Sequence, residues 1–558
     1  MYSNKENVNI LTSLLIDFGI KKAVVCPGSR NSPIVHNLCS CGRMECYPVT
    51  DERSAGFFAI GLAEALNMPV AVCVTSGSAL LNLAPAVAEA YYRNIQLIVV
   101  SADRPLQWIS QSDGQTIRQQ SALEPNIRKS VSLPEPTNAE ERWFCNRLIN
   151  EALNETRRHG GGPVHINVPI SEPLFVYTTP FLPCERTIMI HDSTINRTAL
   201  ETILEEEILK ADRPMLVLGQ LPKYMLGNIE TIEKVCLVLR ERPANNSLQP
   251  QPIDQILSAG IDESMQPDVI IYIGGTIVSK QLKRFLRNCS NVKSILIDDR
   301  AEIRDTFMNL SHVVEASPDE ALDKIVSIAG KLKPGKFVKS WHDAIRKACQ
   351  TIMQQPLDYS HEWAVRELFK QLPRNVETVC GNSTAIRLAN KYSDRYIFVN
   401  RGVNGIEGSL STAVGHSVAV KHTQVCCIIG DLSFFYDHNA LWNRHLRGNL
   451  RILLLNNGGG AIFGKFAGLR ASDAREPFVM GAHHTSAKGI CAAYDVAYYA
   501  ATSPADCAAL LPVFIKQQSR RPVLLEVFTN SETDACAYED LFRHLTTMDD
   551  DRASTPQQ

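Results

Sequence analysis

Two polar residues that each follow an apolar run could together hold a metal ion. Val425 to Ile429 leads into Gly430-Asp431, and Ile452 to Leu455 leads into Asn456-Asn457. A carboxylate and an amide oxygen suit a hard divalent cation such as Mg²⁺, which completes its ligand set with water and phosphate. The pair therefore indicates a cation site that also receives a phosphorylated ligand.

Three glycines, Gly458 to Gly460, follow the second polar residue. Glycine lets the backbone approach a diphosphate closely and leaves its amides free to point at the anion. Glycine and asparagine are also common in ordinary turns, so either motif alone would indicate only a turn. Their combination, with each motif ending an apolar run, favours a metal and diphosphate site.

The apolar runs read as strands and the segment between them as a helix. A strand, helix and strand of this length form a right-handed crossover between parallel strands, and ligands lie beyond the carboxyl ends of such strands. The same alternation recurs along the chain, which predicts an α/β fold with parallel, doubly wound sheets. The other predicted strands are Ala23–Cys26, Val70–Val74, Leu97–Val100, Met215–Leu218, Val269–Ile273 and Ser294–Asp298.

Two sites in the first third could also do chemistry. Ser29 and Arg30 follow the strand Ala23–Cys26, where helix amides and a guanidinium can bind an anion. Glu52 begins an apolar segment, so its carboxylate is expected to be partly desolvated. Each has a simpler explanation when taken alone: a solvated turn arginine, and an acid favoured by the helix dipole.

Gly430-Asp431 followed by Asn456-Asn457 resembles the signature of thiamine-diphosphate enzymes. The resemblance implies thiamine diphosphate and Mg²⁺ or Mn²⁺ as cofactors, with Asp431, Asn457 and the carbonyl of Gly459 as metal ligands. It also implies that Glu52 bonds the aminopyrimidine ring of the cofactor and that Ile406 supports its bent shape. The full set of implied cofactor contacts is Glu52, Ile406, Asp431, Leu432, Ser433, Asn457, Gly459, Gly460, Ile462 and Phe463.

Further motifs, in this order, resemble the MenD family, the thiamine-diphosphate-dependent 2-succinyl-5-enolpyruvyl-6-hydroxy-3-cyclohexene-1-carboxylate synthases of menaquinone biosynthesis. They are Pro27–Arg30, Asp51–Arg53, Thr75–Gly77, Ala102–Pro105, Gln115–Gln119 and His165–Leu174. The resemblance implies a transferase that decarboxylates 2-oxoglutarate and adds the succinyl carbanion equivalent to isochorismate by 1,4-addition. It implies catalytic residues Glu52, Arg30, Gln115, Arg387 and Arg401, and substrate-binding residues Ser29, Arg104, Arg118, Lys280 and Ser383.

At 558 residues the chain is too long for one core. Pro173–Glu185 and Leu332–Lys339 read as linkers, and the last domain is expected to start with helical sequence near Trp341. The resemblance implies a pyruvate-decarboxylase-like architecture: a pyrimidine-binding domain (1–178), a central Rossmann-like domain (190–332), a diphosphate-binding domain (342–545) and a polar tail (546–558). It also implies a homodimer or homotetramer with active sites between subunits.

The balance of charged residues indicates which kinds of macromolecular partner the protein is not expected to have. The 57 Lys and Arg nearly balance the 59 Asp and Glu, which indicates neither a nucleic-acid partner nor a membrane surface. We expect a cytoplasmic protein whose 16 scattered cysteines are reduced. Cys39, Cys41 and Cys46 form the only cluster, and their spacing fits no standard zinc site.

Several motifs are weaker. Gly274-Gly275-Thr276 resembles half of a dinucleotide fingerprint, and a structural turn is the favoured interpretation. Gln281 stands where some members of the family carry Arg, and His483-His484 is interpreted as a surface pair. The alternatives are another thiamine-diphosphate 2-oxo-acid decarboxylase or acetolactate-type synthase, a catalytically silent cofactor-binding scaffold and, more distantly, a nicotinamide dehydrogenase built on Gly274-Gly275.

Overall fold

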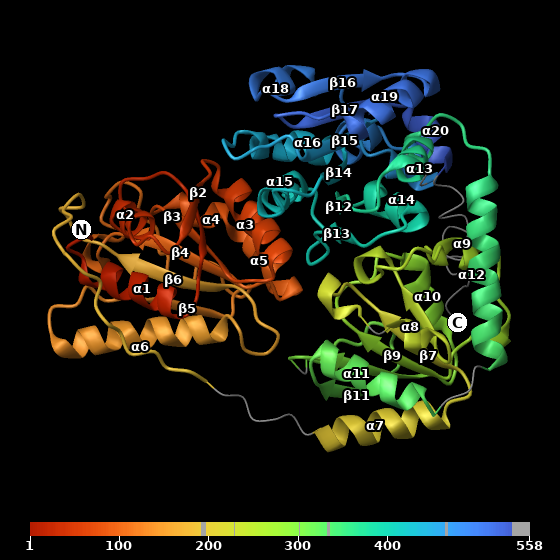
Figure 1. Cartoon of the computed structure of the whole chain (residues 1–558), viewed down its shortest axis with the longest axis horizontal. Coiled ribbons are helices and arrows are strands. Elements are labelled where there is room, and N and C mark those ends of the chain that lie inside the picture. Colours follow the sequence, from red (N-terminus) through yellow and green to blue (C-terminus); the bar gives the residue numbers. More distant parts are fainter. Residues whose placement is uncertain (191–196, 228, 301, 332–334, 464–466, 538–558) are drawn as a thin grey trace.

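The computed structural model describes residues 1–190, 197–227, 229–300, 302–331, 335–463 and 467–537. These residues form three separate sheets, each made of parallel strands with helices packed against it (Figure 1). The α/β class expected from the alternating pattern is therefore confirmed. The predicted tail, 546–558, lies outside the described residues.

The first sheet is built from the first third of the chain. Side by side, its strands are β2 (Glu45–Pro48), β1 (Lys22–Val25), β3 (Val70–Val74), β4 (Leu97–Asp103), β6 (Val164–Pro169) and β5 (Lys129–Ser132). Its helices are α1 (Glu6–Asp17), α2 (Ser32–Ser40), α3 (Glu52–Leu66), α4 (Ser78–Asn82), α5 (Ala84–Arg93) and α6 (Ala139–Glu155). The central strands are fully buried, as expected for a parallel sheet covered on both faces.

The second sheet carries β11 (Leu310–Glu315), β10 (Lys293–Asp298), β9 (Val269–Ile273), β7 (Pro214–Leu218) and β8 (Leu237–Arg240), in that spatial order. Its helices are α7 (Arg197–Lys210), α8 (Ile229–Glu233), α9 (Ile253–Ser258), α10 (Lys280–Asn288), α11 (Pro318–Ala329) and α12 (Lys336–Gln354). The strand order reverses between β7 and β9, so the point where a doubly wound sheet binds ligands lies beyond their carboxyl ends.

The third sheet has the order β13 (Ile397–Val399), β12 (Glu377–Cys380), β14 (Val425–Gly430), β15 (Leu450–Asn456), β17 (Val523–Phe528) and β16 (Ala497–Ala501). Its helices include α13 (His361–Gln371), α14 (Thr384–Tyr392), α15 (Ser409–Ala419), α16 (Asp431–Asp437), α17 (Ala467–Arg470), α18 (Lys488–Ala493), α19 (Pro504–Lys516) and α20 (Ser531–Ala537). Strands β14 and β15 are neighbours, and Gly430 pairs with Leu455.

The helix expected to begin the last domain packs elsewhere. Trp341 and Ile345 of α12 belong to the core cluster of the central sheet, and the Trp341 indole Nε1 donates to the carbonyl of Met265 at 3.0 Å. Part of the second predicted linker is also wrong, because α12 begins at Lys336. An amphipathic helix beside a boundary does not reveal from its own sequence which core it covers.

The first and third sheets meet through two closely packed helices, α3 and α15. A Cβ atom on Gly61 of α3 would lie 2.1 Å from the Thr412 carbonyl oxygen, and one on Gly415 of α15 would lie 2.1 Å from the Phe58 carbonyl oxygen. Only glycine allows this close approach of two backbones. The crossing brings the first residues of α3, Glu52 among them, toward the third sheet.

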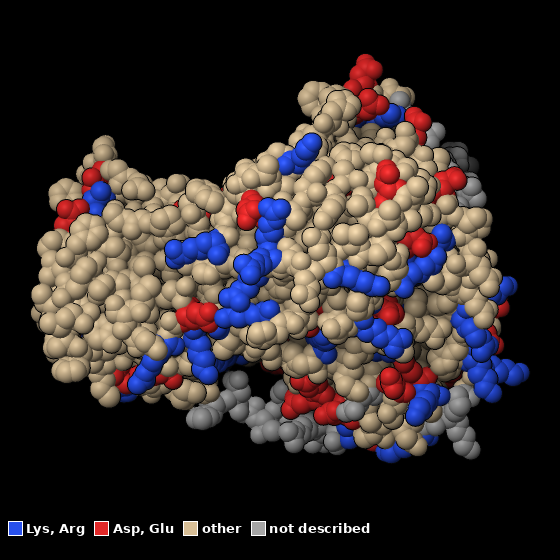
Figure 2. Space-filling view, turned by 45° about the horizontal axis from the view of Figure 1, so that its top comes forward, with Lys and Arg blue, Asp and Glu red and all other residues tan. Residues whose placement is uncertain are grey.

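The distribution of surface charge, the cysteines and the apolar character of the helices can be compared with the composition. Positive and negative side chains are interspersed on the face shown in Figure 2, as the balanced charge implies. All 16 cysteines are free. Among the described helices, none combines the length and apolarity needed to cross a membrane.

Candidate active site

Asp431 lies where the two strands of the predicted cation motif end side by side. It is the first residue of α16, directly after β14, and is 4% exposed. Its Oδ2 accepts backbone N–H bonds from Asn457 at 3.1 Å, Gly458 at 2.9 Å and Gly459 at 3.0 Å. The turn after β15 therefore wraps its amides around the carboxylate that β14 delivers, and fixes the position of that carboxylate.

Asn457 offers an oxygen with no protein partner. Its Nδ2 donates to Asp534 Oδ2 at 2.7 Å, while its Oδ1 is buried and has no hydrogen-bond partner among the described residues. A buried amide oxygen without a partner costs free energy unless a ligand satisfies it. Together with the Asp431 carboxylate and the nearby glycine carbonyls it forms an all-oxygen donor set, so these residues fit a hard divalent cation.

The glycine turn has backbone angles that other residues rarely adopt. Gly458 has φ +80° and Gly459 has φ +149°. A Cβ on Gly459 would also lie 2.9 Å from the Met480 carbonyl oxygen. That same oxygen accepts the Gly460 N–H at 2.7 Å, so this amide is already used by the protein. The turn then enters a short helix, Ala461–Phe463, in which the Phe463 side chain is 40% exposed.

Other predicted cofactor contacts lie beside this turn. The Ser433 hydroxyl donates to the Ile406 carbonyl at 2.6 Å, and the Leu432 N–H donates to Asp431 Oδ1 at 2.7 Å. Ile406 is 44% exposed although it is a large apolar residue. The start of α16 is therefore hydrogen-bonded to the loop that carries Ile406. The Ile406 side chain remains exposed beside it.

Glu52 stands at the first position of α3 and is partly buried. Asn82 donates to its Oε2 at 3.2 Å. Both of its neighbours contact the segment after Asp431: Asp51 Oδ2 accepts from Asn439 Nδ2 at 2.8 Å, and Arg53 donates to the Tyr436 carbonyl at 2.7 Å. The end of α3 that carries Glu52 therefore lies against the residues that follow the cation motif in the same chain.

Two of the predicted arginines meet at the carboxyl edge of the first sheet. Buried Arg30 donates to the Ile170 carbonyl at 2.9 Å and pairs with Glu172 at 3.1 Å. Arg104 pairs with Asp113 at 3.0 Å and also reaches Glu172 at 4.0 Å. Glu172 is largely exposed, so it joins the two guanidiniums at a surface that an anion can reach. The remaining predicted residues of this sheet, Ser29, Gln115 and Arg118, are exposed.

The predicted residues of α14 and the loop after β13 also come together. Arg387 donates to the Ser383 carbonyl at 2.7 Å, and Arg401 donates to Asn382 Oδ1 at 3.2 Å. Arg401 Nε is buried without a partner among the described residues, and burial lowers the pKa of Arg401 to about 10, with a further contribution from the charge of Arg387. Ser383 has φ +64°, a backbone strain that often marks a binding site.

Lys280, at the first position of α10, is exposed. Another lysine of the same helix has a clearer electrostatic link, because burial and then the charge of Arg401 lower the pKa of Lys283. Gln281 is 8% exposed, and its Oε1 accepts the Ser258 hydroxyl at 3.2 Å. The sequence did not single out Lys283, since one lysine among several on a basic helix carries no distinguishing pattern.

His483 is not the surface residue that the sequence suggested. Its Nε2 lies 3.5 Å from Asp431 Oδ2, and its ring packs edge-on against Phe435 with centroids 5.2 Å apart. His484 is exposed, as expected. The His483 N–H also donates to the Gly458 carbonyl at 2.9 Å, and no local pattern predicts that contact.

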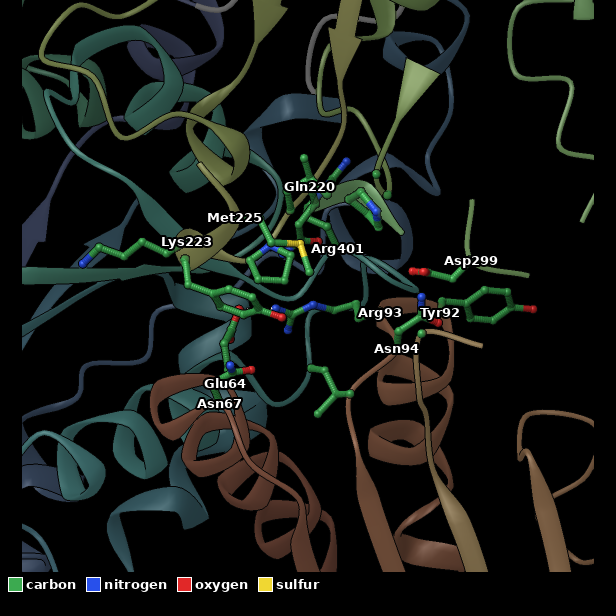
Figure 3. A pocket seen from close by; sticks show the side chains of 18 of the residues that line it. Glu64, Asn67, Tyr92, Arg93, Asn94, Gln220, Lys223, Met225, Asp299 and Arg401 are labelled. Carbon is green, nitrogen blue, oxygen red and sulfur yellow. Dashed lines mark hydrogen bonds and ion pairs between the residues drawn. The ribbon is translucent and has the colours of Figure 1, made fainter. Parts of the chain in front are cut away.

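A cavity of about 630 Å³ lies elsewhere, where the three sheets meet (Figure 3). Of the predicted site residues, all of which the structure describes, Arg401 alone lines it. Its other charges are mostly paired: Arg93 with Glu64, Arg304 with Asp298, and Lys223 with Glu377 at 3.1 Å. This internal pairing distinguishes the cavity from the cation motif, where a buried oxygen is left without a partner.

Comparison with known proteins gives two family matches and a series of full-length relatives. The N-terminal and C-terminal TPP binding domains of thiamine pyrophosphate enzymes match residues 7–123 and 379–527. The chain is 42% identical to the 2-succinyl-5-enolpyruvyl-6-hydroxy-3-cyclohexene-1-carboxylate synthase of Bacteroides thetaiotaomicron, with 98% of this chain and 100% of the relative covered. Proteins of the same name from Phocaeicola vulgatus (42% identical; 98% and 99% covered) and Porphyromonas gingivalis (34% identical; 98% of each covered) also match.

Proposed function

The chain belongs to the family of thiamine-diphosphate-dependent 2-succinyl-5-enolpyruvyl-6-hydroxy-3-cyclohexene-1-carboxylate synthases, and from that premise we propose that it decarboxylates 2-oxoglutarate and adds the succinyl unit to isochorismate. It is therefore a transferase of menaquinone biosynthesis that forms a carbon–carbon bond. The structural observation that carries the proposal is the convergence at one sheet edge of Asp431, the glycine turn and Asn457 Oδ1, which has no partner in the described part of the chain.

The residues proposed to hold Mg²⁺ or Mn²⁺ are Asp431, Asn457 through Oδ1, and Gly459 through its carbonyl. Their donor set fits a hard cation, which can in turn bind the oxygens of a diphosphate. When bound, thiamine diphosphate supplies a nucleophilic carbon and an electron sink for loss of CO₂. The other proposed contacts with it are Glu52, Ile406, Leu432, Ser433, Gly460, Ile462 and Phe463.

Glu52 is proposed to hold the proton that the aminopyrimidine ring needs in order to change tautomer. Its position supports this role, because Glu52 begins α3, is partly buried and accepts a hydrogen bond from Asn82. Glu52→Gln should therefore abolish turnover while cofactor still binds. Loss of cofactor binding and of turnover to the same degree would contradict this role.

The substrates are polyanions, and clustered guanidiniums suit them. Arg387 and Arg401 are proposed to bind the carboxylates of 2-oxoglutarate, and Ser383 and Lys280 are proposed to take part in binding the substrates. Arg401 Nε supports this, because it has no partner in the ranges that the structure describes and a bound carboxylate would satisfy it. Arg30, Arg104 and Arg118, with Ser29 and Gln115, are proposed to bind isochorismate at the edge of the first sheet. Glu172 lies there, within 4.0 Å of the guanidiniums of Arg30 and Arg104.

We propose a pyrimidine-binding domain (1–178), a central domain (190–332) and a diphosphate-binding domain (342–545), except that α12 (Lys336–Gln354) is assigned to the central domain because it packs on the central sheet. We also propose a homodimer or homotetramer whose active sites form between subunits. Large exposed apolar side chains next to the site elements support burial by a second copy. They are Leu81, Tyr92, Val403, Ile406, Tyr436 and Trp442.

Mixing two inactive variants tests the shared site. If Glu52 of one subunit serves Asp431 of the other, a mixed dimer of Glu52→Gln and Asp431→Ala contains one intact site, and activity returns after the subunits are exchanged. If both residues serve the same site from one chain, every site in the mixed dimer keeps one damaged residue. Absence of any recovered activity in verified mixed dimers would then contradict a site between subunits.

The reaction itself is tested by incubating the protein with thiamine diphosphate, Mg²⁺, 2-oxoglutarate and isochorismate, followed by mass measurement of the product. We expect CO₂ release and a product that contains the succinyl unit joined to isochorismate. Product formed from pyruvate instead would identify an acetolactate-type synthase or another decarboxylase. Cofactor binding without CO₂ release would identify a silent scaffold.

A further inference from the structure

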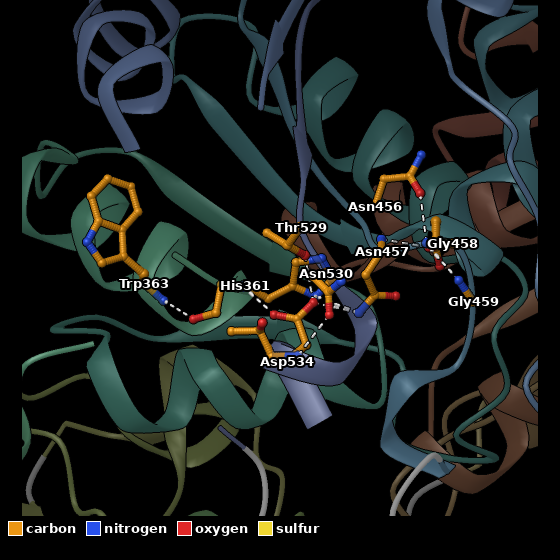
Figure 4. Close-up of polar contacts among 12 residues, drawn as sticks. His361, Trp363, Asn456, Asn457, Gly458, Gly459, Thr529, Asn530 and Asp534 are labelled. Atoms are coloured by element: carbon orange, nitrogen blue, oxygen red, sulfur yellow. Dashed lines mark hydrogen bonds and ion pairs between the residues drawn. The ribbon is translucent and has the colours of Figure 1, made fainter. Parts of the chain in front are cut away.

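A buried carboxylate outside the predicted site lies directly behind Asn457. Asp534, on α20, is 1% exposed. Its Oδ1 accepts the backbone N–H of His361 at 2.7 Å, and its Oδ2 accepts the Thr529 hydroxyl at 2.6 Å and Asn457 Nδ2 at 2.7 Å. In Figure 4 the Asn457 side chain lies between Asp534 and the glycine turn. The carboxylate is thus held from three directions, and Asn457 is one of them.

These contacts determine which way the Asn457 amide faces. An amide can be turned by half a rotation with almost no change in shape, so its orientation depends on its hydrogen-bond partners. A carboxylate accepts hydrogen bonds and cannot donate them. Asp534 therefore requires Asn457 to present Nδ2, and Oδ1 must face the opposite way, where it is buried without a partner among the described residues.

We propose that Asp534 is a positioning residue for the cation site, which fixes the Asn457 amide so that its oxygen faces the divalent ion. This inference rests on the proposed function, because it assumes that Asn457 is a ligand of that ion. Carboxylates behind metal ligands act in this way in other sites, where they orient the ligand and increase the negative charge on its donor atom. No pattern near Asp534 in the sequence pointed to this role, since it lies 77 residues from Asn457.

Asp534→Asn tests the proposal because the new side chain has only one oxygen. If that oxygen accepts the His361 N–H, the new amide nitrogen faces Asn457 Nδ2 and two donors oppose each other. Asn457 then turns and presents Nδ2 to the ion. We expect the Kd for Mn²⁺, measured by electron paramagnetic resonance on the full-length protein with thiamine diphosphate present, to rise by about 10- to 100-fold.

A reciprocal exchange separates orientation from simple structural damage. In the double variant Asn457→Asp with Asp534→Asn, the new carboxylate accepts from the new amide and still offers an oxygen to the ion. We expect Mn²⁺ affinity to return toward the wild-type value. In Asn457→Asp alone, two carboxylates face each other and Mn²⁺ affinity should remain low. These two variants also keep the proposal testable if Asp534→Asn alone does not fold.

Two further measurements complete the test. Glu532→Gln removes an exposed charge from the same helix and should leave the Mn²⁺ affinity unchanged. The Kd for thiamine diphosphate at saturating Mn²⁺ should change little in Asp534→Asn, whereas a damaged fold would weaken both affinities together. Wild-type Mn²⁺ affinity in Asp534→Asn, or no recovery in the double variant, would overturn the positioning role. Failure of the wild-type protein itself to bind Mn²⁺ with thiamine diphosphate would instead overturn the proposed function.

Discussion

The central and third sheets both end neighbouring strands in glycine turns, but the two turns use their polar groups differently. In the third sheet, the amides of Gly458 and Gly459 point at the Asp431 carboxylate, and Asn457 Oδ1 remains unpartnered among the described residues. In the central sheet, the Gly275 N–H donates to the Gln220 carbonyl at 2.8 Å, and the Gly219 N–H donates to the Ile273 carbonyl at 2.9 Å. In the central sheet, the turn after β7 and the turn after β9 are therefore hydrogen-bonded to each other.

The start of the helix after the central turn is also occupied. A glycine turn that leads into a helix normally offers amides to a phosphate. Before α10, the N–H groups of Val278 and Ser279 instead donate to the Glu241 carboxylate, the second at 2.7 Å. The Tyr272 hydroxyl donates to the Gly275 carbonyl at 2.5 Å. An acid of the protein thus binds where the phosphate of a dinucleotide would bind.

The difference shows that glycines alone do not identify a ligand site at a sheet edge. Glycine is required at both places, because a Cβ on Gly219 would lie 1.8 Å from the Gly275 carbonyl oxygen and one on Gly459 would lie 2.9 Å from that of Met480. What distinguishes the third sheet is the polar residue that the partner strand delivers. The comparison predicts that substitutions at the edge of the third sheet weaken cofactor binding. Substitutions at the edge of the central sheet are predicted to lower the stability of the fold.

The largest effect is expected for Asp431→Asn. This change removes the charge that balances a cation and weakens the acceptor that organises the glycine amides. The Kd for thiamine diphosphate in the presence of Mg²⁺, measured by fluorescence titration, should rise by more than the roughly 100-fold typical of residues behind a metal ligand. Asp473→Asn, an exposed acid of the following loop, is the control. Unchanged affinity in Asp431→Asn would remove the distinction between the two edges.

Gly219→Ala should act on stability instead. The new Cβ cannot be accommodated against the Gly275 carbonyl without moving one of the two turns. We expect the free energy of unfolding, measured by chemical denaturation, to fall by about 1–3 kcal/mol. Gly227→Ala has no atom within 4 Å of the new Cβ and serves as the control. A stable Gly219→Ala protein that no longer binds thiamine diphosphate would contradict a purely structural role.

The sequence predicted the strands of both edges closely, because parallel strands are continuous apolar runs. Val269–Ile273 of the central sheet was predicted with the bounds that the structure has, and the predicted run Val425 to Ile429 of the third sheet is one residue shorter than β14. The sequence also predicted that Asp431 and Asn457 lie close together, because the strands that precede them were expected to end at the same edge of one sheet. His483, Asp534 and Glu241 were missed because each reaches its partner across a long stretch of chain. Such contacts depend on tertiary packing, and the local pattern does not contain them.

The acid that occupies the central edge should have a measurable pH dependence. Burial raises the pKa of Glu241 to about 7, against an ordinary value of 4.5. The folded protein therefore holds this proton to a higher pH than the unfolded chain does. The stability that this gives is fully present below the unfolded pKa and is lost as the pH rises through about 7.

Glu241→Gln removes this titration. Between about pH 5 and 8 the free energy of unfolding should fall less steeply with pH in the variant than in the wild-type protein. Glu263→Gln, an exposed acid of the same sheet's connections, should keep the wild-type slope. Equal slopes in Glu241→Gln and the wild type would show that this carboxylate is not the buried acid that titrates.

The smallest effect is expected when nicotinamide cofactors are added. A dinucleotide at the central edge would have to displace Glu241 from Val278 and Ser279 and separate the turns at Gly219 and Gly275. NAD⁺ should therefore leave the midpoint of thermal unfolding unchanged, whereas thiamine diphosphate with Mg²⁺ should raise it, because a ligand that binds only the folded state stabilises that state. Glu241→Gln sharpens the test, since it frees part of the helix start without adding a positive charge. A shift with NAD⁺ in the wild type would mean that the central edge binds a ligand despite its internal pairing, and the contrast between the two sheets would fail.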